Sequence, residues 1–326
     1  MPADRNPSPH VLALDFGGTK LAAGLVDIRS GQILAYQRRD TPAAQGAAAS
    51  IQTMLDLGRQ VLQQAGIAQA ARVGISFGGP VSANRQQVLV SNHVADWDGV
   101  ALPHLAAAAF SCPAAMDNDA NAAALGAWAF DAHRQPNNLV YIQISTGVGA
   151  GLILNRTLFR GGALAGEVGH ITMQAGGPEC TCGKRGCLES LCSGWAIARD
   201  ARRALRAAAP DSLLMRRCAG QPESLDARMV LEAAAQGDPL AWGIAEQAFT
   251  ALGIAIANVI CLIDPDRIVL GGGIVRAEGV VRAVLEPTLA REIPAMFKNR
   301  CQLSFSKLEG RETLLGAALL PDEEPV

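Results

Sequence analysis

The feature that most constrains this chain is a segment with one histidine and three closely spaced cysteines, between Gly166 and Glu189. It reads G-E-V-G-H-I-T-M-Q-A-G-G-P-E-C-T-C-G-K-R-G-C-L-E. Imidazole and thiolate are ligands that Zn²⁺ favours, and three cysteines with one histidine close a tetrahedral site that has no open position. Ordinary buried thiols are the alternative, but three of the eight cysteines fall within eight residues and the others are scattered. The predicted ligands are His170, Cys180, Cys182 and Cys187.

Two carboxylates, Glu167 and Glu189, flank the same segment. The four predicted ligands complete a zinc site without them, so both are available to another partner. Glycines between the cysteines let the backbone fold tightly enough to bring the thiolates together. Solvated surface carboxylates are the alternative reading of this pair.

Composition narrows the class of protein. The 326 residues suffice for two domains, and 49% hydrophobic with 18% charged residues indicates a globular chain. A net charge of −2 gives no reason to expect a nucleic-acid partner. Residues 1–10 lack the apolar core of a signal peptide, and no uninterrupted apolar run reaches the ~18 residues of a membrane span. Scattered thiols suit a reducing cytoplasm better than a disulfide framework.

A glycine turn follows the first apolar run, at Asp15-Phe16-Gly17-Gly18-Thr19-Lys20. Apolar runs on both sides predict a β-hairpin. The backbone N–H groups of this turn and the Thr19 hydroxyl can face a phosphate, and Asp15 can hold a hydrated Mg²⁺. The spacing of a Walker A loop is absent, and so is G-x-G-x-x-G. Taken alone, the motif is equally typical of an ordinary hairpin turn.

A cluster of polar residues, Asp117-Asn118-Asp119-Ala120-Asn121, stands between a short predicted strand at 113–116 and an Ala-rich helix at 119–130. Helix capping would explain one such residue, because Asn and Asp favour that position. Four polar side chains exceed that need, which favours a site. We predict Asp119 as the functional carboxylate and Asp117 as support or ordinary surface, because the helical pattern starts near Ala120.

The strand–turn–strand pattern recurs at 139–154, around Ser145-Thr146-Gly147. A third glycine run, Gly271-Gly272-Gly273, follows the predicted strand at 267–270. Strands alternate with long helical patterns, among them 47–65, 194–208 and one or two helices over 239–263. This alternation predicts an α/β fold.

Together these motifs resemble the ROK family (repressors, open reading frames and sugar kinases), and the resemblance covers nearly the whole chain. The combination E-x-G-H followed by C-x-C-G-x-x-G-C-x-E is the most specific part. The resemblance implies a two-lobed, actin-like (ribonuclease H-like) sugar-kinase fold with a zinc-containing loop. We expect a small lobe of residues 1–119 completed by a C-terminal helix at 310–321, and a large lobe of residues 120–309 with the zinc loop at 166–190.

The resemblance also implies roles for single residues. Asp119 would be the catalytic base, and His170 would give one ring nitrogen to zinc and the other to a sugar hydroxyl. The sugar-binding residues would be Gly79, Asn92, Asn118, Asp119, Glu167, His170 and Glu189. The ATP-binding residues would be Asp15, Gly17, Gly18, Thr19, Lys20, Thr146, Gly147, Gly271, Gly272 and Gly273.

The implied activity is ATP- and Mg²⁺-dependent phosphorylation of a hexose at O6, with glucose first, by a cytoplasmic homodimer of carbohydrate metabolism. The alternatives are kinases of N-acetylmannosamine, N-acetylglucosamine, fructose or allose, and polyphosphate as the phosphoryl donor. Some amino-sugar kinases of the family have arginine where this chain has Pro80. A sugar-sensing regulator is the non-enzyme alternative, but the first strand begins near residue 11, which leaves no room before it for the family's DNA-binding domain.

Overall fold

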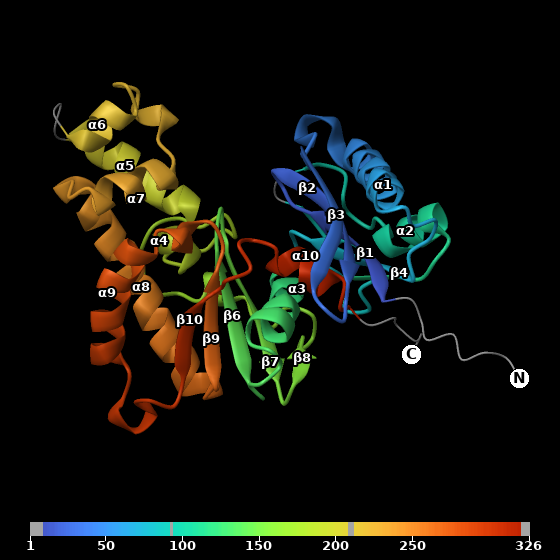
Figure 1. The fold of residues 1–326 in the computed structure, drawn as a ribbon. Coiled ribbons are helices and arrows are strands. Elements are labelled where there is room, and N and C mark those ends of the chain that lie inside the picture. Colours follow the sequence, from blue (N-terminus) through green and yellow to red (C-terminus); the bar gives the residue numbers. More distant parts are fainter. Residues whose placement is uncertain (1–8, 92–93, 208–211, 321–326) are drawn as a thin grey trace, which may run out of the picture. The chain divides into compact units, whose positions relative to one another are not determined.

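The structure is a computed structural model that describes residues 9–91, 94–207 and 212–320 (Figure 1). The chain forms two compact units. The first contains residues 1–135, 151–165 and 307–326, and the second contains residues 136–150 and 166–306. The chain therefore passes from one unit to the other four times, and neither unit is a continuous segment.

The first unit is built on a five-stranded mixed sheet. Its strands, in spatial order, are β3 (Gln32–Asp40), β2 (Lys20–Asp27), β1 (His10–Phe16), β4 (Arg72–Phe77) and β5 (Ala114–Asn118). The first three are antiparallel, as the predicted hairpin requires, and β1, β4 and β5 are parallel. The parallel strands end level with one another, since Phe16 pairs with Phe77 and Phe77 with Asn118. Side chains at the ends of these strands therefore lie along the same edge of the sheet.

Helices cover both faces of this sheet. Leu12, Leu14 and Phe16 of β1 share a core with α1 (Gly46–Ala65) and α2 (Leu102–Phe110). The alternate residues Val11 and Ala13 pack with the short helix α10 (Glu312–Ala317), as side chains that alternate across a strand must. Helix α3 (Asp119–Gly126) packs closely against α10. Figure 1 shows α10, from the end of the chain, beside the first strands.

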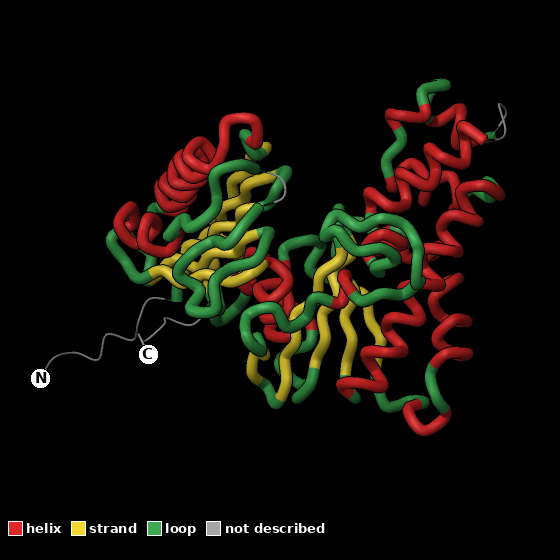
Figure 2. The backbone as a smooth tube through the Cα atoms, turned by 180° about the vertical axis from the view of Figure 1, so that it is seen from behind, coloured by secondary structure: helices red, strands yellow, loops and turns green. Residues whose placement is uncertain are grey.

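The second unit contains most of a five-stranded sheet and the remaining helices, and Figure 2 shows both sheets as yellow tubes. The strand order is β10 (Gln302–Phe305), β9 (Arg267–Gly271), β6 (Leu139–Ile144), β7 (Val148–Leu154) and β8 (Thr157–Phe159), with the unit boundary inside β7. The helices of four or more residues are α4 (Glu189–Cys192), α5 (Gly194–Ala207), α6 (Leu213–Arg217), α7 (Ala227–Ala235), α8 (Pro239–Ile263) and α9 (Glu278–Glu292).

Helix α8 is the one described helix that is long and apolar enough to cross a membrane by those criteria alone. Of its most apolar window, 56% is buried within the protein. It packs against α4, α5, α7 and α9, and Phe249, Leu252 and Ile256 are fully buried. Here α8 is the central helix of the second unit, and its apolar composition serves that packing.

Most predicted elements are present, with extended or shifted ends. The strand expected at 113–116 continues to Asn118 because its pairing with β4 extends that far. The helix expected at 119–130 divides into α3 and a π-helical turn over Ala127–Asp131. Strand β8 and helix α6, both short, were not predicted, and the span 239–263 is a single helix.

Candidate functional site

The glycine turn between β1 and β2 is held by two contacts from Thr41. The turn is closed by the Gly17 N–H, which donates to the Lys20 carbonyl at 3.0 Å. The Thr41 hydroxyl donates to the Gly17 carbonyl at 2.8 Å, and the Thr41 N–H donates to the Thr19 carbonyl at 3.0 Å. Thr19 and Lys20 are exposed. The carbonyls of the turn are thus engaged by the protein, and the Thr19 hydroxyl is accessible to a ligand.

Asp15, one residue before the end of β1, is partly buried and accepts a hydrogen bond from the Ser76 hydroxyl at 2.9 Å. Burial raises the pKa of Asp15 to about 7, the Ser76 hydrogen bond opposes this rise, and the nearby Asp119 carboxylate adds to it. Carboxylates that raise one another's pKa are suited to share a cation, since a cation relieves their repulsion.

Asp119 is the first residue of α3, directly after β5. The Ala120 N–H donates both to the Asn118 side chain and to the Asp119 carboxylate, each at 2.9 Å. The other end of the Asn118 amide donates to the Gly79 carbonyl at 3.1 Å. A Cβ atom at Gly78 would lie 3.2 Å from the Phe16 carbonyl and 3.9 Å from an Asp119 oxygen, so this loop is close to both. The predicted base thus lies beside the end of β1, where the first glycine turn begins.

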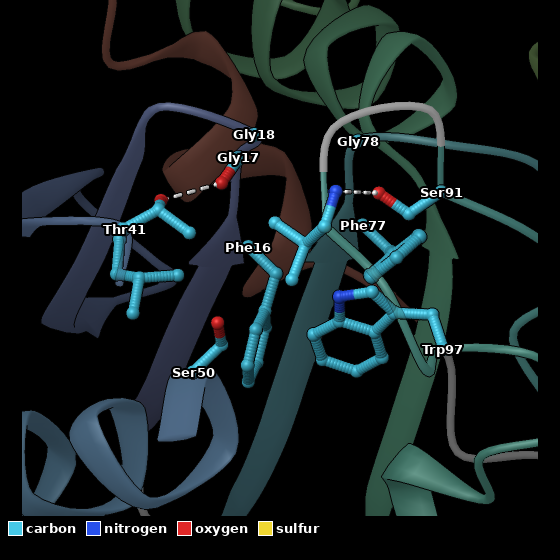
Figure 3. A pocket seen from close by; sticks show the side chains of 11 residues that line it. Phe16, Gly17, Gly18, Thr41, Ser50, Phe77, Gly78, Ser91 and Trp97 are labelled. Carbon is cyan, nitrogen blue, oxygen red and sulfur yellow. Dashed lines mark hydrogen bonds between the residues drawn. The ribbon is translucent and has the colours of Figure 1, made fainter. Parts of the chain in front are cut away.

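A pocket of the first unit lies under this turn (Figure 3). The rings of Phe16, Phe77 and Trp97 form its apolar part, with Trp97 edge-on to both phenylalanines. Gly17, Gly18, Gly78 and Ser91 line the part next to the turns. Asn92, predicted to bind sugar, lies outside the described residues.

The second glycine turn, Ser145–Gly147, lies against the third glycine run within the second unit. The Ser145 N–H donates to the Gly147 carbonyl at 2.9 Å, and the Gly194 N–H donates to the Ser145 carbonyl at 2.8 Å. Gly272 has a φ of +93°, and a Cβ there would lie 2.2 Å from the Ile144 carbonyl. Only glycine fits that approach. Thr146, Gly147 and the run Gly271–Gly273 therefore lie at the adjacent ends of β6 and β9.

The four predicted zinc ligands form one cluster. Their ligand atoms all lie within 4.8 Å of one another. The distance from Cys182 Sγ to Cys187 Sγ is 3.7 Å, and from His170 Nδ1 to Cys180 Sγ it is also 3.7 Å. Zinc with Zn–S bonds of about 2.3 Å has sulfur atoms about 3.8 Å apart at the corners of a tetrahedron, so the spacing fits this ion.

The local backbone makes that cluster possible. Gly186 has a φ of +75°, and a Cβ there would lie 1.6 Å from the Gln174 carbonyl. Burial raises the pKa of the Cys187 thiol to about 12. A metal ion would have to displace that proton, so binding would release protons and strengthen as pH rises.

Glu189 connects the cysteine segment to the second glycine turn. This side chain is 9% exposed. One carboxylate oxygen accepts from the Val148 N–H at 3.0 Å, and the other accepts from the Thr181 hydroxyl at 3.1 Å. A Cβ at Gly147 would lie 2.6 Å from the same Glu189 carboxylate. The sequence placed Glu189 beside a sugar, and these contacts show that its carboxylate also supports the turn.

Glu167 and His170 lie on the accessible side of the cluster. His170 Nε2 is 3.8 Å from a Glu167 carboxylate oxygen, and the side chains are 34% and 44% exposed. Partial burial raises the pKa of Glu167, His170 lowers it, and Glu189 raises it further. One His170 nitrogen therefore faces the thiols and the other faces Glu167 and solvent, which is the arrangement expected of a ligand with two partners.

Most of the supporting residues were missed by the sequence analysis. Asp117 was predicted as support or ordinary surface; it is 1% exposed, which excludes the surface alternative, and its carboxylate binds the Arg160 guanidinium at 2.6 Å. Arg160, Ser76 and Thr41 belong to no recognisable motif, and Thr181 occupies an unspecified position of the cysteine motif. Three of them meet their partners across 24 to 61 residues, so no local pattern signals them.

The sequence is similar to those of known sugar kinases. A sequence model of the ROK family matches residues 11–324. A glucokinase of Thermotoga maritima is 32% identical over 318 residues, covering 97% of this chain and 98% of the relative. An N-acetylmannosamine kinase of Escherichia coli strain HS is 34% identical over 316 residues, covering 96% and 98%.

The structure is also similar to solved structures of the same family. The crystal structure of a ROK family glucokinase from Streptomyces griseus in complex with glucose and AMPPNP aligns with a TM-score of 0.84 and 30% identity, over 95% of this chain and 98% of that one. The α/β fold with two mixed sheets resembles ROK sugar-kinase structures. On the extent of these matches, the chain belongs to the ROK family.

Proposed function

We propose that this protein is an ATP-dependent sugar kinase that phosphorylates a hexose at O6, with glucose as the best acceptor. The observation that carries the proposal is Asp119, a partly exposed carboxylate at the start of α3, beside the β1–β2 turn and close enough to Asp15 to raise its pKa. The glucokinases among its relatives and the glucose complex of a similar structure support the same substrate class.

In the proposed reaction, the proton of the sugar O6 hydroxyl moves to Asp119 as O6 forms a bond to the γ-phosphorus of ATP. The bond from that phosphorus to the bridging oxygen of ADP breaks, which gives the sugar 6-phosphate and ADP. A carboxylate within hydrogen-bond reach makes the hydroxyl a better nucleophile, and the rest of catalysis is positioning and neutralisation of charge. Asp15 would hold a hydrated Mg²⁺, and that ion would supply part of the charge neutralisation.

The residues proposed to bind substrates occur in both units. From the first unit, Asn118 and Gly79 would bind sugar, with Asn92, and the turn at Gly17, Gly18, Thr19 and Lys20 would bind phosphate. From the second, Glu167, His170 and Glu189 would bind sugar hydroxyls. Thr146, Gly147 and Gly271–Gly273 would bind nucleotide through backbone N–H groups. The lobes implied by the family resemblance are residues 1–119 with 310–321, and residues 120–309.

We also propose that the Cys₃His cluster holds a structural Zn²⁺, because its spacing fits a tetrahedral ion and all four corners are protein ligands. Its role would be to fix the segment that carries Glu167 and Glu189. A cytoplasmic homodimer remains part of the proposal, as the family resemblance implies.

An N-acetylhexosamine kinase is the second candidate, favoured by the N-acetylmannosamine kinases among the relatives. Initial rates with glucose, mannose, fructose, allose, N-acetylglucosamine and N-acetylmannosamine, each with ATP or polyphosphate, separate the two. We expect the highest kcat/KM with glucose and ATP. A markedly higher value for an N-acetylated sugar would transfer the proposal to that class. Thermal stabilisation by sugar without turnover would indicate a regulator.

The role of Asp119 is tested by Asp119→Asn, which keeps shape and hydrogen bonding but removes the base. A positioned base contributes roughly 10²–10⁴-fold to rate, so we expect kcat to fall at least about a hundredfold. Calorimetry should find glucose and ATP still bound. Near-normal kcat in a preparation free of wild-type enzyme would remove Asp119 from the mechanism.

A further inference from the structure

The buried Asp117 carboxylate accepts hydrogen bonds from three other residues. Its side chain is 2% exposed. One oxygen accepts from the Asn118 N–H and from the Asn121 amide, both at 2.8 Å. The other oxygen accepts from Arg160 Nε at 2.6 Å. These bonds join three segments of the first unit: the end of β5, the first turn of α3, and the residue that follows β8.

These contacts of Asp117 hold the chain on both sides of Asp119, the proposed base. Asn118 precedes Asp119 and caps α3, while Asn121 lies on the first turn of the same helix. Asp117 therefore fixes the backbone before Asp119 and a side chain after it. Because Asp119 is the first residue of the helix, rotation of this junction would turn its carboxylate away from a substrate hydroxyl.

Arg160 is the cationic partner of the buried Asp117 carboxylate. Within the part of the chain that the structure describes, the guanidinium makes no other hydrogen bond or ion pair than the one to Asp117. Its side chain is 21% exposed, so the pair is largely removed from water. A buried carboxylate that loses its partner is strongly disfavoured and would protonate or move.

We propose that Arg160 is a positioning residue for phosphoryl transfer: it holds the Asp117 carboxylate, and through it fixes the strand–helix junction that aims Asp119. The inference rests on the proposed function, in which Asp119 is the base. Arg160 lies 41 residues after Asp119 in the sequence, outside every motif that suggested the site.

The rival explanation is that the pair contributes stability alone. Arg160→Met keeps the length of the side chain and removes the charge, so it should lower Tm under either explanation. The double variant Arg160→Met with Asp117→Asn separates them. Asparagine can still accept from Asn118 and Asn121 but carries no charge, so the double variant should regain most of the lost Tm. A stabilising role predicts that kcat returns with Tm, whereas a positioning role predicts that kcat stays low.

The experiment measures Tm, kcat and KM for glucose and ATP in wild type, Arg160→Met, Arg160→Lys and the double variant. We expect kcat to fall about tenfold in Arg160→Met, less than the hundredfold possible for a misplaced group, with both KM values within about threefold of wild type. Arg160→Lys, which keeps the charge, should recover most of kcat. Arg156→Met is the matched control, because Arg156 is an exposed arginine of the neighbouring β7–β8 turn.

The outcomes are distinct. Low kcat with recovered Tm in the double variant supports the inference. Wild-type kcat in Arg160→Met, or recovery of kcat together with Tm, overturns it while the proposed function stands, provided that Asp119→Asn is inactive in the same assay. Near-normal kcat in Asp119→Asn overturns both, since there would be no base to position.

Discussion

The two glycine turns have similar local chemistry but are held in place by different means. Both join two strands and both contain threonine and glycine, at Gly17–Thr19 and at Ser145–Gly147. The first is supported by neutral groups of its own unit, the Thr41 hydroxyl and N–H. The second is supported by a buried carboxylate, Glu189, which lies two residues after the last cysteine of the cluster. Glu189 therefore links the second turn to the Cys/His segment of the same unit.

Loss of the proposed zinc ion should therefore disorder the second turn and leave the first unchanged. We expect Cys187→Ser to leave zinc clearly below one per chain by elemental analysis. Structural zinc contributes on the order of 10 kcal/mol, and each kcal/mol shifts Tm by about 2–4 °C, so a fall of about 20 °C or more is expected. Hydrogen exchange should quicken at the Val148 amide and stay unchanged at the Gly17 amide. Cys261→Ser, an exposed cysteine, is the control.

A methyl group added to each turn gives a second, smaller contrast. A Cβ at Gly17 would lie 2.8 Å from the Lys20 backbone carbonyl, and a Cβ at Gly147 would lie 2.6 Å from the Glu189 carboxylate. Overpacking costs about 1–3 kcal/mol, so both alanine variants should bind ATP roughly tenfold more weakly in calorimetry. Gly147→Ala should also speed zinc loss to a chelator, because it displaces Glu189. Equal rates of zinc loss in the two variants would contradict the coupling.

Removal of one supporting hydroxyl from each turn is milder still. Thr41→Val removes the donor to the Gly17 carbonyl, and Thr181→Val removes the donor to Glu189. A hydrogen bond contributes about 1 kcal/mol, so we expect the Kd for ATP to rise about fivefold in each. Chelator resistance should fall in Thr181→Val alone. A change of the same size in Thr41→Val would mean that both turns respond to the cluster.

The turns should also differ in their response to pH. Asp15, one residue before the end of β1, has a pKa raised from 3.8 to about 7, chiefly by burial, whereas β6 before the second turn contains no carboxylate. The folded state thus holds the Asp15 proton more tightly than the unfolded chain. This contribution to stability is present below about pH 4 and is lost as pH rises to about 7. Denaturant unfolding from pH 4 to 8 should show it in wild type, and Asp15→Asn should flatten that part of the profile.

The sequence was most informative where chemistry is local. The Cys/His cluster was predicted residue by residue, because short spacings and tight glycines bring those side chains together. The bounds of α8 agree with the predicted helical span of 239–263, and β9 is one residue longer than the strand predicted at 267–270. The junction at Asn118 and Asp119 was also placed correctly, between a strand and a helix.

Contacts between residues far apart in the sequence could not be predicted from it. Arg160 meets Asp117 across 43 residues and Glu189 meets Val148 across 41, and both contacts arise from the order of strands in a sheet and the path of a loop. The short strand β8 carried no periodicity because three residues are too few to show one. The Ala-rich sequence is compatible with any helical geometry, so it did not indicate the π-helical turn that follows α3.

The position of α10 has a consequence for how this protein is made. Gly74 of β4 carries no side chain where the Ala317 carbonyl approaches, since a Cβ there would lie 1.9 Å away, and Gly316 is in the same relation to the Ala122 carbonyl. This fit can form only after residue 317 has left the ribosome. At about 5–20 residues per second, the sheet face with Val11 and Ala13 waits on the order of 10–60 s for its cover. During that interval the apolar side chains of this sheet face are not covered by α10, and exposed apolar surface of this kind favours aggregation of a nascent chain.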